Sequence, residues 1–166
     1  FTKGLEVLHR LPNSTERAQQ ELMEQVSLDQ VLMMTKRRSA TVVEDAYTRA
    51  LELCQQTGEQ IQLFSALRGL WECYETRGEL SKAHELAEQF FTAAQARQDL
   101  THQLIAHDAL GDTLFWRGEL ALAQQHLERG VTLYDPHQHS ALAFFHGGYD
   151  PGVACACLGA CTVWLL

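Results

Sequence analysis

Apolar residues recur along much of the chain at intervals of three and four residues, which place them on one face of an α-helix. Between residues 42 and 56, for example, Ala46, Ala50 and Leu53 follow this spacing. No stretch sustains the alternation of apolar and polar residues that is typical of a half-buried β-strand. The pattern therefore predicts an all-α protein.

Glycine and proline divide this pattern into segments. Gly78 and Gly118 each end a segment, because glycine accommodates the backbone conformation that commonly terminates a helix. Asp135-Pro136 and Asp150-Pro151 each begin one, with a capping aspartate before a proline at the first helical position. The segments predicted to be helical span residues 14–35, 42–56, 61–76, 79–97, 100–116, 119–134, 137–145 and 153–166.

Most of these segments pair into helical hairpins, and we expect one repeat domain over residues 1–166. Residues 1–12 are predicted to be the tail of a helix that begins upstream. Two further helices are predicted in 137–166, the last without a hairpin partner. Because the chain begins at Phe1 and ends in an apolar run, we expect it to be a piece of a longer protein. The predicted hairpins span residues 14–57, 60–97 and 100–135.

The chain contains an internal repeat with a period of 40 residues. The sequence Arg-Gly-Glu-Leu occurs at 77–80 and again at 117–120. The same shift aligns small and apolar positions on both sides of this turn. Because a turn and its flanking packing positions recur together, we expect two hairpins of the same build. The aligned residues are Ala66, Leu70, Ala83, Glu88 and Thr92 with Ala106, Leu110, Ala123, Glu128 and Thr132.

The spacing within one repeat describes two closely packed helices. Gly111, after Leu110, allows a neighbouring helix to approach, Gly118 accommodates a tight turn, and Ala123 lets the second helix lie close to the first. This order resembles the tetratricopeptide repeat (TPR), a helical hairpin. The resemblance implies a right-handed α-α superhelix of TPR-like hairpins. The preceding hairpin departs from the pattern, because Trp71 stands where a small residue is expected.

The amino-acid sequences of several segments resemble those of a narrower group, the TPR arm of large bacterial signalling proteins. In these proteins an adenylate or guanylate cyclase or a protein kinase domain precedes an AAA-type ATPase domain, and the repeats follow. The resemblance implies a non-enzymatic, cytoplasmic interaction or regulatory scaffold, with any catalytic domains upstream. The segments concerned are GLEVLHRLPNSTERAQQELM, AYTRALELCQQTGE, LFWRGELALAQQHLERGVTLYDPHQHSALAF and YDPGVACACLGACTVWLL.

Charge narrows the choice of partners. The chain has 21 acidic and 13 basic residues, a formal net charge of -8, which disfavours binding to nucleic acid. The basic run Lys36-Arg37-Arg38 is predicted to be a solvated break between helices or a contact with an acidic partner. The longest apolar run, 153–166, is too short to cross a bilayer. We therefore expect a buried helix there and no membrane partner.

The cysteines do not have the spacing of a zinc site. Five cysteines with no signal peptide favour reduced thiols. In a helix, Cys157 and Cys161 share one face, whereas Cys155 points elsewhere. We expect these cysteines to be packing residues, with no bound metal.

The eight histidines form no recognisable ligand or catalytic motif. His137 and His139 are the tightest pair and are predicted to be solvated loop residues. His84, His107 and His126 fall within predicted helices and are expected to be partly buried. We find no nucleophile with a base at motif spacing, so the sequence predicts neither a catalytic residue nor a cofactor.

The TPR resemblance implies that the first helix of each hairpin lines a concave binding wall. The inferred groove mixes acidic and aromatic residues and favours a basic or apolar peptide, or another domain of the same parent chain. An alternative for the two aromatic residues is burial against neighbouring helices. The candidate binding residues are Arg68, Glu72, Glu75, Asp108, Asp112, Phe115 and Trp116.

Two other functions remain open from the sequence. A sugar-like small molecule would stack on Phe115 and Trp116 and hydrogen-bond to Asp108 and Asp112. The third candidate is an oligomerisation or spacer element, whose last helix at 153–166 either forms a homodimer or frays.

Overall fold

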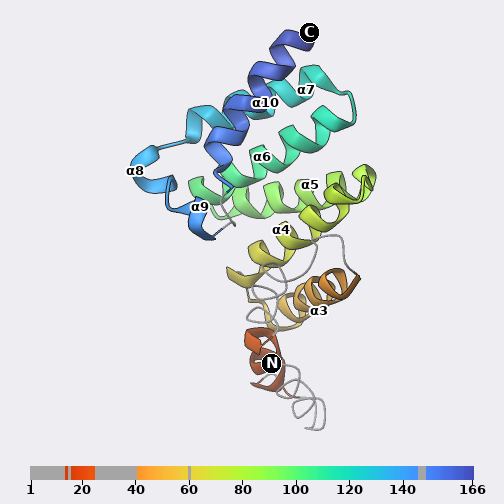
Figure 1. The fold of residues 1–166 in the computed structure, drawn as a ribbon. Coiled ribbons are helices and arrows are strands. Elements are labelled where there is room, and N and C mark those ends of the chain that lie inside the picture. Colours follow the sequence, from red (N-terminus) through yellow and green to blue (C-terminus); the bar gives the residue numbers. More distant parts are fainter. Residues whose placement is uncertain (1–13, 15, 25–40, 60, 146–148) are drawn as a thin grey trace. The chain divides into compact units, whose positions relative to one another are not determined.

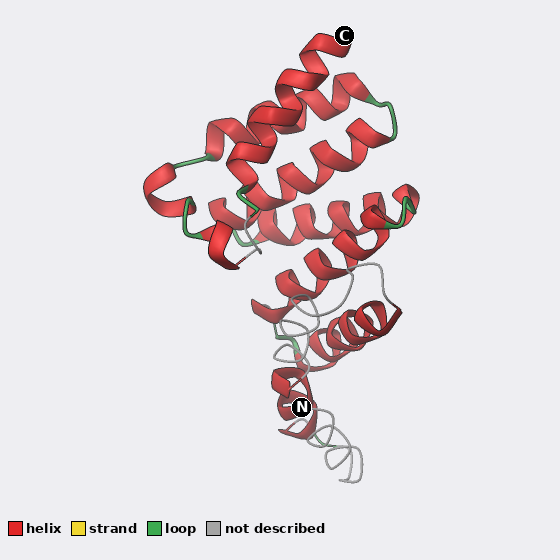
Figure 2. Cartoon of the chain, viewed as in Figure 1, coloured by secondary structure: helices red, strands yellow, loops and turns green. Residues whose placement is uncertain are grey.

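The computed structural model describes residues 14, 16–24, 41–59, 61–145 and 149–166, and over these ranges it is helical without a β-strand (Figures 1 and 2). The all-α prediction is confirmed. The basic run 36–38, the upstream tail 1–12 and most of the first predicted helix lie outside the described residues. A helical segment covers residues 16–24. The labelled helices are α3 (Thr41–Thr57), α4 (Ile61–Thr76), α5 (Leu80–Ala96), α6 (Leu100–Trp116), α7 (Leu120–Leu133), α8 (Pro136–His139), α9 (Leu142–Phe145) and α10 (Pro151–Leu165).

The helix boundaries follow the capping residues. Asp99, Asp135 and Asp150 each accept a hydrogen bond from a backbone N–H in the first turn of the helix that they precede. One boundary prediction is wrong, because residues 137–145 form two short helices instead of one. The first of these helices ends at His139, whose side chain is buried and accepts a hydrogen bond from the backbone N–H of Asp135 at 2.9 Å.

The chain divides into two compact units, residues 1–78 and 79–166. The core of the first unit joins the segment 16–24 to α3 and α4. In α4, Gly69 lies against the ring of Tyr47 from α3, and a Cβ atom at this glycine would meet the ring at 2.3 Å. Glu44 of α3 accepts hydrogen bonds from Tyr74 and Arg77 near the end of α4. The core residues are Leu22, Ala50, Leu53, Cys54 and Ala66.

The second unit is built around α6. This helix contacts α5, α7 and α10, and α10 also contacts α7 (Figure 1). A Cβ atom at Gly111 would lie 2.6 Å from the Leu127 side chain, and one at Gly130 would lie 2.4 Å from the Cys155 sulfur. The predicted role of Gly111 in close packing is therefore confirmed. Gly130 allows α10 to approach α7 in the same way.

The repeated Arg-Gly-Glu-Leu sequence adopts the same local backbone at both sites. Gly78 and Gly118 have φ values of +75° and +78°, and the following Glu79 and Glu119 share φ near -80° and ψ near 57°. In each case the glycine N–H donates to the carbonyl three residues earlier, at 2.8 Å and 3.0 Å. Only glycine adopts this left-handed conformation without strain. The sequence repeat is thus a repeat of structure at the turn.

Helix α10 buries one face and exposes the other. Cys155, Gly159 and Thr162 are buried, whereas Val153 and Trp164 are 55% and 83% exposed. The prediction of a buried helix is therefore wrong for half of its circumference. Among the described helices, none is both long and apolar enough to span a membrane.

Candidate functional site

The candidate binding residues are divided between the two units. Arg68, Glu72 and Glu75 lie on α4, in the first unit. The other four lie on α6, in the second unit, and each group is described by itself. The residues on α6 are Asp108, Asp112, Phe115 and Trp116.

On α4, the two charged side chains one turn apart are paired with each other. Arg68 Nη2 lies 2.7 Å from Glu72 Oε1, and these side chains are only 12% and 6% exposed. Glu75 is half-buried. Because the Arg68–Glu72 pair is formed within the helix and largely withdrawn from water, it offers little free charge to a partner.

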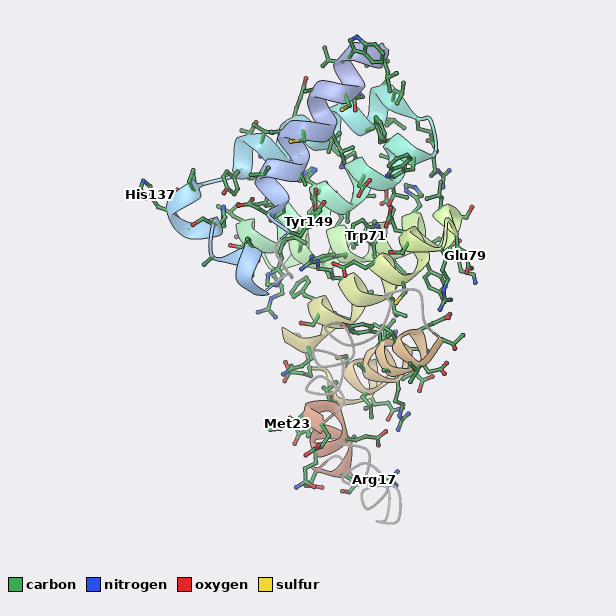
Figure 3. All side chains as sticks on the ribbon, viewed as in Figure 1. Arg17, Met23, Trp71, Glu79, His137 and Tyr149 are labelled. Atoms are coloured by element: carbon green, nitrogen blue, oxygen red, sulfur yellow. The ribbon has the colours of Figure 1, made fainter. Side chains whose placement is uncertain are left out.

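On α6, Asp108 is enclosed. Its side chain is 1% exposed, and its Oδ1 accepts a hydrogen bond from the Tyr149 hydroxyl at 3.0 Å. The Cys155 thiol of α10 lies 3.7 Å from the same oxygen. Figure 3 shows Tyr149 among the helices of the second unit, at the segment that leads into α10. Asp108 therefore fixes the start of α10 and is not open to a ligand.

Burial and nearby carboxylates keep the Tyr149 hydroxyl and the Cys155 thiol protonated. Burial raises the pKa of Tyr149 and of Cys155 above their ordinary values, and the carboxylates of Asp108 and Asp112 add to both shifts. A hydroxyl and a thiol that hold their protons at neutral pH can each donate to Asp108. Sequence reasoning missed this cluster, because Tyr149 and Cys155 are more than 40 residues from Asp108 and follow no local spacing.

The aromatic pair at the end of α6 is divided between core and surface. Phe115 packs against the cluster that contains Leu127 and Cys155. Trp116 is 59% exposed, and its ring meets that of Phe115 edge to face with centroids 5.3 Å apart. Asp112 lies one turn earlier on the same helix and is half-buried. An exposed indole, a partly exposed phenyl ring and a carboxylate thus lie within two turns of one helix.

A pair of histidines crosses from α6 to α7. His107 Nδ1 lies 3.1 Å from His126 Nδ1, and the Phe91 ring of α5 packs against both rings. Burial, and then the proximity of His126 and of the Arg129 cation, lowers the pKa of His107 to about 4. Burial also lowers the pKa of His126. The predicted partial burial of these histidines is confirmed, but their contact had no signal in the sequence.

The loop histidines and the cysteines differ from expectation. His137 is exposed, but His139 is 4% exposed and its Nε2 lies 3.2 Å from Thr101 Oγ1, so the prediction of two solvated histidines is wrong for His139. Cys157 and Cys161 are exposed, so they are not packing residues, although they share a helix face as predicted.

All five cysteines are unpaired with one another. Cys54, Cys73 and Cys155 are buried, and burial raises the pKa of Cys54 to about 11. In the part of the chain that the structure describes, no three His, Cys, Asp or Glu side chains converge as a metal site would require.

Comparison with known proteins provides no relative from which a role could be transferred. No protein-family model, curated protein or solved structure matches the chain.

Proposed function

We propose that this chain is a non-enzymatic protein-interaction module, built of TPR-like hairpins in a right-handed superhelix. The observation that carries the proposal is the repeated turn. Gly78 and Gly118 share the same positive φ, and the residues that follow them share their backbone angles. The packing of the second unit also supports it, since α6 contacts the helix before it, the helix after it and α10. Such stacking is how helical repeats build extended binding surfaces.

The binding surface that we propose lies at the C-terminal end of α6. We call it the Trp116 surface, and it comprises Asp112, Phe115 and Trp116. Exposed tryptophan is enriched at positions that contribute most to protein binding, because it buries a large apolar area. Asp112 adds a negative charge, and the chain carries a net charge of -8. A peptide segment with apolar and basic side chains is therefore the partner class that fits best.

In the cell, we propose that the module acts as a regulatory arm of a larger bacterial signalling protein in the cytoplasm. This part of the proposal rests on the resemblance of its segments to such arms. Its partner would be a peptide or another domain of the same parent chain.

A peptide-binding measurement with two tryptophan variants tests the proposal. The probes are fluorescein-labelled peptides of two compositions, one rich in lysine and leucine and one rich in glutamate and serine. Trp116→Ala is expected to weaken binding of the lysine- and leucine-rich peptide at least about tenfold. Trp164→Ala is the matched control, because Trp164 is also exposed but lies on α10. Fluorescence anisotropy provides both dissociation constants.

The outcome separates the alternatives. Equal affinity of wild type and Trp116→Ala, or no binding of either peptide, would contradict the proposal. A sugar ligand is the second candidate, favoured by the exposed Trp116 ring on the same helix as Asp112, one turn later, because sugars stack on aromatic faces and hydrogen-bond to carboxylates. Calorimetric titration with a panel of mono- and disaccharides tests it, and binding that Trp116→Ala abolishes would support it.

A further inference from the structure

The outer face of α10 is a continuous exposed apolar strip. The residues at the helical spacing of this face are all exposed and all uncharged. No charged residue occurs between Pro151 and Leu165. We call this surface the α10 stripe. It comprises Val153, Ala156, Cys157, Ala160, Cys161 and Trp164.

This exposure belongs to a helix that is held in place. The opposite face of α10 packs on α6 and α7, and Cys155, Gly159 and Thr162 there are buried. Of the eleven large exposed apolar residues in the described part of the chain, five lie on α10 or directly after it, and two of these, Val153 and Trp164, belong to the α10 stripe. Such a concentration of exposed apolar residues marks an interaction surface, whereas single exposed apolar residues are ordinary.

The α10 stripe is symmetric about its midpoint, between residues 158 and 159. The large residues Val153 and Trp164 lie at its two ends. The small residues lie between them, two on each side of the midpoint. If a copy of the helix is turned end for end, Val153 faces Trp164, Ala156 faces Cys161, and Cys157 faces Ala160. The order of larger and smaller residues is therefore the same from either end of the stripe.

We propose that the α10 stripe binds a second copy of this chain, with the two α10 helices antiparallel across a two-fold axis. A two-fold axis requires a surface that is complementary to itself, and the symmetric stripe meets this requirement. Small residues at the crossing point allow a close approach, and the large residues fill the space where the helices diverge. The face also carries no charge, so two chains of net charge -8 meet without like charges at the contact.

The register of this pairing brings two different cysteines together. Cys157 of one copy lies beside Cys161 of the second copy, with an axial offset of one residue, or about 1.5 Å. A parallel pairing would instead bring each cysteine beside its own equivalent. Cys155 is buried and takes no part in either arrangement.

Oxidative cross-linking distinguishes the two orientations. Diamide converts two thiols to a disulfide by taking two electrons and two protons, and is itself reduced to the hydrazine. The wild-type chain is expected to form a covalent dimer on a non-reducing gel. Cys157→Ser is expected to abolish it, because the remaining Cys161 residues of an antiparallel pair lie five residues, or about 7.5 Å, apart along the helix axis. A Cys157→Ser variant that still cross-links would overturn the antiparallel register, and absence of a wild-type dimer would overturn the proposal.

Sedimentation equilibrium tests the association without cysteine chemistry. The wild-type chain is expected to approach twice the monomer mass as its concentration rises to about 100 μM, whereas Ala160→Glu is expected to remain monomeric, since the glutamate would be buried without a partner. Ala121→Glu on α7 is the matched control, because Ala121 is also an exposed helical alanine. A wild-type monomer throughout, or equal association of both variants, would contradict the proposal.

The two tryptophan variants keep this inference separate from the proposed function. Trp164→Ala is expected to weaken dimerisation and leave peptide binding unchanged. Trp116→Ala is expected to do the reverse. Loss of both properties in Trp164→Ala alone would show that the α10 stripe, and not the Trp116 surface, binds the peptide.

Discussion

Helices α6 and α10 are both strongly apolar but have different surroundings. Both begin at a capping aspartate, Asp99 or Asp150. In α6, nine of 17 residues are buried, because α5, α7 and α10 contact it. In α10 only five of 15 are buried, because its main described contacts come from two helices, α6 and α7. The comparison indicates that a sequence suited to enclosure is enclosed in one helix and left half open in the other.

The polar groups of the two helices reinforce this difference. The central helix α6 carries Asp108 and His107 into the interior, where Tyr149 and His126 contact them. The outer face of α10 carries no charged side chain into water. Composition alone would rank α10 as the more deeply buried helix, and it is the more exposed one.

Removing a large side chain from each helix is the strongest test of the comparison. Leu110→Ala in α6 is expected to lower the free energy of unfolding by about 2–5 kcal/mol, because it leaves a cavity in an enclosed site. Val163→Ala in α10 is expected to cost at most about 0.5 kcal/mol, because this side chain is 61% exposed. Urea unfolding followed by circular dichroism, at a dilution where the chain is monomeric, measures both. Equal costs would mean that α10 is enclosed as well.

A pair of tyrosines tests the contact that joins α6 to the start of α10. Tyr149→Phe is expected to cost about 1–3 kcal/mol, because it removes a donor to the buried Asp108 carboxylate. Tyr134→Phe is the control and is expected to cost less than about 1 kcal/mol. Its hydroxyl donates to Asp150 at 2.8 Å, but that carboxylate is only partly buried. Chemical denaturation of both variants provides the comparison, and a larger cost for Tyr134→Phe would refute the assignment of Asp108 as the critical acceptor.

Lowering the pH is expected to reduce the free energy of unfolding through His107 of α6, with no direct effect on α10. The pKa of His107 is about 4 in the folded chain and ordinarily 6.5, so protons bind the unfolded chain more tightly. The stabilisation is therefore complete above pH 6.5 and is lost as the pH falls towards 4. The expected loss is about 1 kcal/mol, since partial exposure of the ring screens its interactions.

Other titratable or charged groups lie close to His107 and also affect the pH dependence. They are His126 and Arg129 of α7, while Glu88 and His84 of α5 act on His126. His107→Leu is expected to flatten the dependence of unfolding free energy on pH between 6.5 and 4. An unchanged slope in His107→Leu would assign the pH dependence to other groups.

Much of the local structure was predictable from the sequence. The bounds of α4 and α6 match the predicted segments, because glycine and capping aspartate act within one turn of the helix end. The left-handed conformation of Gly118 and the close helix approach at Gly111 were also predictable, since the absence of a Cβ atom permits both. Of the candidate site, Trp116 is exposed and its binding role stays a prediction, whereas the enclosure of Asp108 was not foreseen.

By itself the sequence determined which segments are helical, where they turn, and that one turn is used twice. These properties depend on residues within a few positions of each other, and backbone sterics and capping decide them. Only the tertiary structure decided that Tyr149 and Cys155 close over Asp108, that His107 meets His126, and which face of α10 stays open. Those contacts join residues far apart in the chain, and burial there depends on which helices pack together, which no local spacing encodes.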